Sequence, residues 1–163
     1  MKTANIATTT LREKAVVVWL HTNVDPLPEE WKAGIDITVA LMRKNGIENM
    51  RSFVVSDGGA PNSAQRRQLA EAFGGRPHKL VVVTNSLTNP VKRGVATAIS
   101  WINPAFKAVG PAMWHDALRH VDLEGELDAL LLVLRRLQED LPSVATLVEL
   151  ERSSATVAAL LRD

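Results

Sequence analysis

Short hydrophobic segments rich in β-branched residues alternate along this chain with longer segments of helical periodicity, and this alternation restricts the fold more than any other feature. The three clearest hydrophobic segments are KAVVVWLHTN (14–23), MRSFVVSD (50–57) and KLVVVTN (79–85). Such runs are typical of strands, and nearly continuous apolar runs are typical of strands covered on both faces. Strands that alternate with helices imply right-handed crossovers. We therefore predict an α/β protein with a mainly parallel sheet of four or five strands and flanking helices.

Helix signals occupy the intervals between these strands. Pro28 suits the first turn of one helix, Gly46 suits its end, and Ser63 is a suitable N-cap for the next. A brief strand is predicted at 106–110, and NIATTTLRE near the N-terminus can supply a hairpin partner for the first strand. The segments predicted to be helical are 27–46, 64–73, 90–102 and 111–121.

The chain changes character after residue 122, where glycine almost disappears and leucines recur at the spacing of an amphipathic helix. Pro142 is expected to separate this helix from a second one. We predict an α/β domain over residues 1–122 and a helical C-terminal extension over 123–163. The extension either packs on the domain or joins two copies into a homodimer through the stripe formed by Leu127, Leu130, Leu131, Leu134 and Leu137.

Composition excludes several classes of function. Apolar residues make up 46% and charged residues 23% of the 163 residues, and the net charge is +1, as in an average globular protein. The short basic pairs, Arg66 with Arg67 and Lys92 with Arg93, form no stripe for nucleic acid. Cysteine is absent, which excludes disulfides and thiolate chemistry. No apolar run resembles a signal peptide or a membrane span, so a cytoplasmic location is predicted.

Polar and glycine residues gather where two predicted strands end. Because the carboxyl ends of parallel strands meet at one edge of a sheet, ligands commonly bind there. The same residue types also suit turns and helix caps, and a purely structural role for them therefore stays open. The predicted partner- or ligand-binding residues are Ser56, Asp57, Gly58, Gly59, Ser63, Arg66, Thr84, Asn85, Ser86 and Arg93.

Catalytic motifs do not fit this edge. SDGGAPNSAQRR lacks the lysine and the spacing of a phosphate-binding P-loop. A receiver-type phosphoaspartate site at Asp57 would need an acidic pair after the first strand, where the sequence reads WLHTN. No nucleophile elbow is present. No cofactor or metal is predicted. A non-catalytic role is favoured over an enzyme, and enzymatic activity stays open.

The aromatic and histidine side chains are assigned structural roles. The tryptophans lie among apolar neighbours, so core packing is expected for Trp19, Trp31, Trp101 and Trp114. The histidines form no cluster with metal-ligand spacing. We expect surface or partly buried positions for His21, His78, His115 and His120.

The order of elements resembles the SpoIIAA-like branch of the STAS (sulfate transporter and anti-sigma factor antagonist) domains. The residues that carry the resemblance are the Glu-Glu-Trp helix start, the strand ending at Asp57, QRRQLAE after Ser63, and KLVVVTNS with VKRGVATAISWINP, FKAVGP and WHDAL. They cover roughly residues 5 to 121. The resemblance implies a partner-facing loop after the central strand and phosphorylation at the following helix start, for which Ser63 is the nearest position and Ser56 the second. SDGGAPNS departs from the usual Asp-Ser-Ser/Thr-Gly order at this point.

Three functions follow as hypotheses. The first is a non-catalytic regulatory module that binds a protein partner through loop 56–63, helix 64–73 and loop 84–90. The second is a binder of a small anionic or apolar ligand over the same edge, with Arg66, Thr84 and Arg93 in contact. The third is a structural homo-oligomer assembled through the C-terminal helices.

Overall fold

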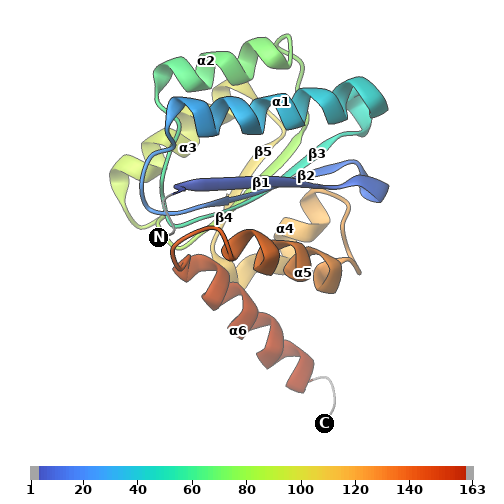
Figure 1. Ribbon diagram of the computed structural model, residues 1–163. Helices are drawn as coiled ribbons and strands as arrows, with labels where there is room; N and C mark the ends of the chain where they lie inside the picture. The colour runs from blue at the N-terminus through green and yellow to red at the C-terminus, as the bar shows by residue number, and fades with distance from the viewer. Residues whose placement is uncertain (1–3, 161–163) are drawn as a thin grey trace.

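A five-stranded sheet in the order β1-β2-β3-β4-β5 forms the centre of the computed structural model, which describes residues 4–160 (Figure 1). β1 pairs antiparallel with β2, and the remaining neighbours are parallel. The predicted mainly parallel sheet and its N-terminal hairpin are thus confirmed. The strands are β1 (Ile6–Leu11), β2 (Val16–His21), β3 (Arg51–Ser56), β4 (Lys79–Thr84) and β5 (Phe106–Val109).

Two helical layers cover the sheet (Figure 1). Successive parallel strands are neighbours, so right-handed crossovers place all three connecting helices on one face. These are α1 (Pro28–Asn45), α2 (Ser63–Ala72) and α3 (Pro90–Ile102). The other face is covered by α4 (Trp114–His120) and α5 (Leu127–Gln138), while α6 (Ala145–Leu160) runs from the strand ends away from the sheet.

Alternate residues of the strands supply two separate cores. Val16, Val18 and Leu20 point into the layer of α4 and α5, whereas Val17 and Trp19 point into the layer of α1 and α2. The first core also contains residues from beyond position 122. These include Leu130, Leu134, Leu141 and Leu150.

The leucine stripe of the C-terminal extension packs on the protein's own sheet. Leu130 and Leu134 are fully buried against the strands, and the break between α5 and α6 falls at Pro142 as predicted. The stripe is therefore not an open surface for a second copy. A homodimer through other parts of these helices stays a prediction.

Two sequence expectations are corrected by the fold. Asn62, and not Ser63, is the N-cap of α2. Its side-chain oxygen accepts a hydrogen bond from the Gln65 N–H at 2.9 Å, and the Gln65 side-chain oxygen accepts one from the Asn62 N–H at 2.9 Å. Trp101 does not pack in the core; 81% of its surface is exposed on α3. The periodicity of α3 is helical, but this helix covers the sheet only loosely.

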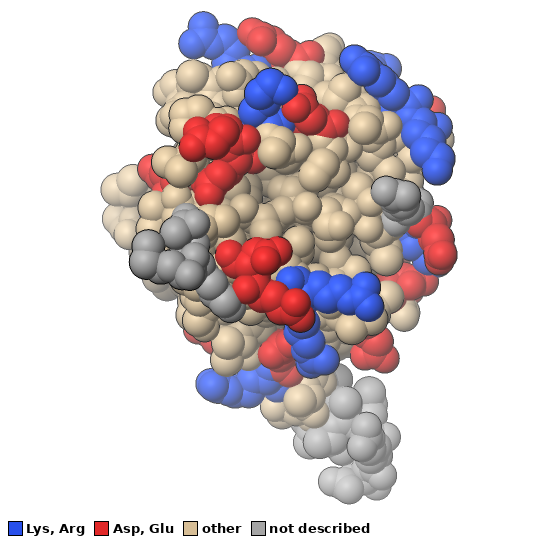
Figure 2. Space-filling view, viewed as in Figure 1, with Lys and Arg blue, Asp and Glu red and all other residues tan. Residues whose placement is uncertain are grey.

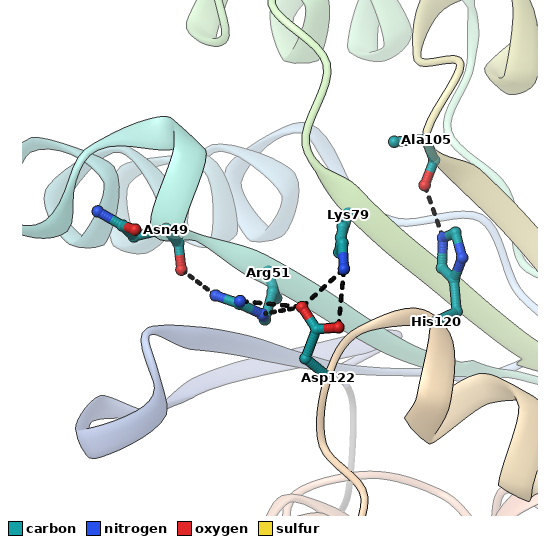
Figure 3. Close-up of polar contacts among 6 residues, drawn as sticks. All are labelled: Asn49, Arg51, Lys79, Ala105, His120 and Asp122. Carbon is teal, nitrogen blue, oxygen red and sulfur yellow. Dashed lines mark hydrogen bonds and ion pairs between the residues drawn. The ribbon is translucent and has the colours of Figure 1, made fainter.

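An ion-pair cluster joins the starts of two central strands to the C-terminal layer (Figure 3). Asp122 accepts hydrogen bonds from Arg51 of β3 at 3.0 Å and from Lys79 of β4 at 2.7 Å. Close by, the His120 ring nitrogen Nε2 donates to the Ala105 carbonyl at 2.7 Å. These contacts lie at the amino ends of β3 and β4, away from the predicted functional edge.

Candidate functional site

A pocket lies between the sheet and helices α1, α2 and α3, and we call it the sheet–helix pocket. Its cavity volume is about 110 Å³. It opens beside the loops that follow β3 and β4, which are the loops singled out from the sequence. The walls are mainly carbon, and they include Val54, Leu69, Phe73, Leu80, Val82 and Ile99.

Three buried ring nitrogens on residues that line this pocket have no hydrogen-bond partner among residues 4–160. They are Nδ1 of His21, Nε1 of Trp31 and Nδ1 of His78. Buried polar groups in folded proteins are nearly always paired, and an unpaired one costs about 1–3 kcal/mol. Indole Nε1 is a donor only, so Trp31 calls for an acceptor. Unmet hydrogen-bonding capacity is thus concentrated around one apolar cavity.

His21 ends β2 with only 4% of its surface exposed. Its ring stacks against that of Trp19 at a centroid distance of 6.1 Å, and Trp19 in turn lies 5.5 Å from Trp31. Burial disfavours the charged imidazolium and lowers the pKa of His21 to about 4, with a small opposing effect from the charge of Asp25. His21 is therefore a neutral imidazole at physiological pH.

His78 precedes β4 on the opposite side of the pocket. Its Nε2 lies 3.3 Å from the Ser52 hydroxyl, and its ring lies 3.9 Å from that of Phe73. Its backbone is held by Asn103, which accepts from the His78 N–H and donates to the His78 carbonyl. Burial lowers the pKa of His78 to about 4. Both histidines were expected at partly exposed positions, and the structure corrects this because both are buried.

The Gly58–Gly59 loop lines the pocket together with Ser86 and Lys92. Gly58 has a φ of 108°, which favours glycine, and a Cβ at Gly59 would lie 2.4 Å from the Val24 carbonyl oxygen. Both glycines thus have a structural reason to be there. Among the described residues that line the pocket, Lys92 alone carries a formal charge at neutral pH.

Half of the predicted site residues line this pocket. Their polar groups are largely paired with each other: the Ser56 hydroxyl accepts from the Gly58 N–H at 3.0 Å, and the Thr84 and Ser86 hydroxyls lie 2.8 Å apart. Ser56 is also buried, so its loop must open before another protein could reach it. The residues concerned are Ser56, Gly58, Gly59, Thr84 and Ser86.

Asp57 and Asn85 lie together at the same edge, but they face α6. The Asp57 carboxylate accepts from the N–H groups of Ala145 and Thr146, each at 2.7 Å. The Asn85 N–H donates to the Thr146 hydroxyl at 3.3 Å, and the Asn85 side chain donates to Glu149 at 3.4 Å. These two predicted site residues anchor the C-terminal helix.

Ser63, Arg66 and Arg93 lie outside the pocket. Arg66 donates to the Ser63 hydroxyl at 3.2 Å and to the Pro61 carbonyl at 2.7 Å, at the exposed start of α2. Arg93 is exposed on α3. The predicted contacts of Arg66 and Arg93 with a ligand over the strand ends stay a prediction, and Lys92 is the basic residue that lines the pocket.

The sequence interpretation missed the residues that define the pocket. His21, Trp31 and His78 come from a strand end, a helix and a loop, and no local pattern joins them. The nearest signal was the position of His21 and His78 beside predicted strands, where burial is common. Lys92 was noted only as half of a basic pair.

Within residues 4–160, no three His, Cys, Asp or Glu side chains are arranged to hold a metal ion. In the same range, each helix is too short or too polar to cross a bilayer. Comparison of the chain with protein-family models, curated proteins and solved structures finds no match. The fold and the site define an α/β protein with a five-stranded mixed sheet and an apolar pocket on one face, and the SpoIIAA-like resemblance stays a prediction.

Proposed function

We propose that this protein binds a small, mainly apolar ligand in the sheet–helix pocket. The observation that carries the proposal is the grouping of three unpaired buried nitrogens, on His21, Trp31 and His78, around one carbon-lined cavity. Binding sites for small molecules combine apolar walls with a few polar groups that orient the ligand. Because these nitrogens are themselves buried, a ligand with a matching polar atom relieves the cost of leaving them unpaired only when neighbouring side chains shift to admit it.

The chemistry of the walls defines the class of ligand. Trp31 donates, so the buried part of the ligand carries an acceptor such as a carbonyl, ether or hydroxyl oxygen. His21 and His78 are neutral, and no buried cation is available to balance an anion deep in the pocket. An anionic group is accommodated beside Lys92. The ligand is therefore an apolar body with a neutral polar group inside and, where charged, an acidic end outside.

The volume limits the size of the ligand. An engineered apolar cavity of roughly 150 Å³ binds benzene, so a cavity of about 110 Å³ holds a short alkyl chain or a single small ring. A longer ligand extends out through the opening or displaces α3. None of the 13 residues of α3, all of them described, is buried, whereas α1 buries Trp31 and α2 buries Gln65.

Binding can be tested with unbranched carboxylates and alcohols of increasing length, measured by calorimetry and thermal unfolding. A probe at 100 times its Kd is expected to add about 2.7 kcal/mol to the free energy of unfolding. Ala108 of β5 lines the pocket, so Ala108→Phe is expected to fill it and abolish binding. Ala112→Phe, at an exposed position outside the pocket, is the matched control. Equal binding by both variants would contradict the proposal.

The role of the indole donor can be tested separately. Trp31→Phe keeps an aromatic ring but removes Nε1. We expect it to raise the Kd of oxygen-containing probes about tenfold. A hydrocarbon probe of the same length lacks the acceptor and is expected to bind both forms alike. Trp114→Phe removes a buried indole from the other layer and serves as the control.

A second candidate is the regulatory protein-interaction module predicted from the sequence. The observation in its favour is the exposed Ser63 hydroxyl, 3.2 Å from the Arg66 guanidinium at the start of α2. Arg67→Glu, on the exposed part of α2, tests this surface in a pulldown against the wild-type protein. Recovery of one and the same partner by both forms would contradict it. Gly59 is unsuitable for this test, because a side chain there would collide with backbone carbonyls.

A further inference from the structure

The outer side of α3 carries exposed apolar side chains that no other part of the described chain covers. Trp101 is 81% exposed and Val91 is 72% exposed, while the other three tryptophans are at most 7% exposed. Ile102, which follows Trp101 at the end of the helix, is 39% exposed. An exposed indole does not gain the free energy that burial of its large apolar surface provides. We therefore expect a partner to cover this side chain.

The exposed residues are distinct from those that wall the pocket. Val95, Ala96 and Ile99 of α3 line the sheet–helix pocket. At about 100° per residue, Trp101 projects from the side of the helix opposite Ile99. Val91 lies about 40° from Val95 around the helix axis, so it borders the pocket wall. Over the ten positions from Val91 to Trp101 the helix rises about 15 Å. The surface centred on Trp101 therefore adjoins the pocket wall at Val91 but contains none of the residues that line the pocket.

Charge is distributed unevenly in the part of the chain that contains α3. Between residues 58 and 115 there is one acidic residue, Glu71, although the whole chain has a net charge of only +1. By contrast, Figure 2 shows acidic and basic side chains interspersed over the face formed by α1, β1 and α5. The seven basic residues of the 58–115 segment are Arg66, Arg67, Arg76, Lys79, Lys92, Arg93 and Lys107.

Basic side chains flank the apolar residues of α3 at both of its ends. Lys92 and Arg93 lie in its first turn, and α3 contains no acidic residue. At the other end, Arg76 and Ile102 line a common groove between α2 and α3. An apolar strip between cations is the arrangement that attaches helices to the surface of an anionic bilayer.

We propose that the protein docks on anionic lipid bilayers through the outer side of α3. Trp101 and Val91 enter the boundary between headgroups and acyl chains, and Arg93 and Arg76 contact lipid phosphates and carboxylates. The attachment is peripheral and reversible, because the apolar strip is one helix long and lies parallel to the surface. The lack of acidic groups favours a lipid surface over a protein partner, which would need its own dense anionic patch.

Cosedimentation of the full chain with vesicles tests this proposal. Vesicles of phosphatidylcholine with one third phosphatidylserine are expected to bind the protein, and vesicles of phosphatidylcholine alone to bind it at least tenfold more weakly. Trp101→Glu is expected to abolish binding. Leu132→Glu, a comparable change at an exposed leucine of α5, is expected to leave it intact. No sedimentation with either vesicle, equal binding to both, or unchanged binding by Trp101→Glu would overturn the proposal.

Two further measurements separate the apolar and ionic contributions. Arg93→Gln is expected to weaken binding about fivefold at low salt, whereas Arg136→Gln on α5 is expected to have no effect. Brominated acyl chains are expected to quench the fluorescence of the wild-type protein, and Trp101→Phe is expected to remove this quenching, since the other tryptophans are buried. Quenching that persists in Trp101→Phe would show that α3 is not the docking element.

This inference stands apart from ligand binding in the pocket. Ala108→Phe, which fills the pocket, is expected to sediment with vesicles like the wild type, and Trp101→Glu is expected to bind pocket ligands like the wild type. Loss of vesicle binding in Ala108→Phe would contradict the separation of the two surfaces.

Discussion

The carboxylate of Asp57, in the loop after β3, accepts a hydrogen bond of 2.7 Å from the backbone N–H of Thr146, 89 positions later in the chain. The adjacent Ala145 N–H binds the other oxygen. The first N–H groups of a helix have no partner within the helix. Here an acidic residue from elsewhere in the chain accepts their hydrogen bonds. Thr146 completes the contact by donating its hydroxyl to the Ser56 carbonyl at 3.0 Å. The candidate functional edge is thereby tied to α6.

Replacing Asp57 tests this anchoring role. Asp57→Ala leaves two N–H groups at the start of α6 without partners, and we expect the free energy of unfolding to fall by about 1–2 kcal/mol. Chemical denaturation measures the change. Asp36→Ala removes an exposed carboxylate that pairs with Lys32 and is expected to change stability by less than about 0.5 kcal/mol. Equal effects of the two variants would contradict the capping role.

Stability is expected to fall on mild acidification because two neutral histidines are buried. Burial lowers the pKa of His21 and of His78 from 6.5 to about 4. Above pH 6.5 both histidines are unprotonated in the folded and in the unfolded state. Between pH 6.5 and about 4 only the unfolded chain binds protons at these histidines, so stability is lost as pH falls through this range. The loss is on the order of 3 kcal/mol for each histidine.

Urea denaturation at about pH 7 and about pH 4.5 checks this expectation. His78→Gln is expected to remove roughly half of the pH dependence. His115 is exposed on α4, so His115→Gln is expected to leave the dependence unchanged. A wild-type protein equally stable at both pH values would show that the two rings are not held neutral by burial.

Two helical glycines are expected to respond to alanine in opposite directions. A Cβ at Gly34 of α1 would lie 2.4 Å from the Trp19 ring, so Gly34→Ala is expected to cost about 1–3 kcal/mol. A Cβ at Gly94 of α3 meets no described atom within 4 Å. Gly94→Ala therefore gains helix propensity, about 1 kcal/mol. Thermal unfolding of the two variants checks the signs, and a stabilised Gly34→Ala would indicate that Trp19 moves freely.

The Asp122 cluster is expected to contribute little despite its short contacts (Figure 3). The hydrogen bond from Lys79, and then that from Arg51, holds the pKa of Asp122 below its usual range. The stabilisation is therefore present near neutral pH and lost as pH falls through that lowered pKa. Because the side chain is 45% exposed, Asp122→Asn is expected to cost less than about 1 kcal/mol. Asparagine tolerates the φ of 54° at this position.

Salt distinguishes this contribution from packing. The difference between wild type and Asp122→Asn is expected to shrink in concentrated salt, since exposed charges are screened. A loss above about 2 kcal/mol that salt does not reduce would mean that Asp122 supports the backbone turn before α5 rather than an ion pair.

The type and order of the elements could be predicted from the sequence because the signals are local. Runs such as AVVVWL and the caps around Pro28 and Gly46 depend on neighbouring residues alone, and the structure places those elements within one or two residues of their predicted bounds. The gathering of Asp57 and Asn85 at one edge also followed from parallel pairing, and both contact Thr146.

Tertiary structure alone decided what those residues do. His21, Trp31 and His78 meet around a cavity because three crossovers bring their elements to one face, and no spacing along the chain reveals this. Trp101 has the apolar neighbours of a core residue, yet α3 turns it outward. Periodicity determines which residues share a helix face or a strand face, whereas packing between distant segments determines which faces are covered and which polar atoms are left without partners.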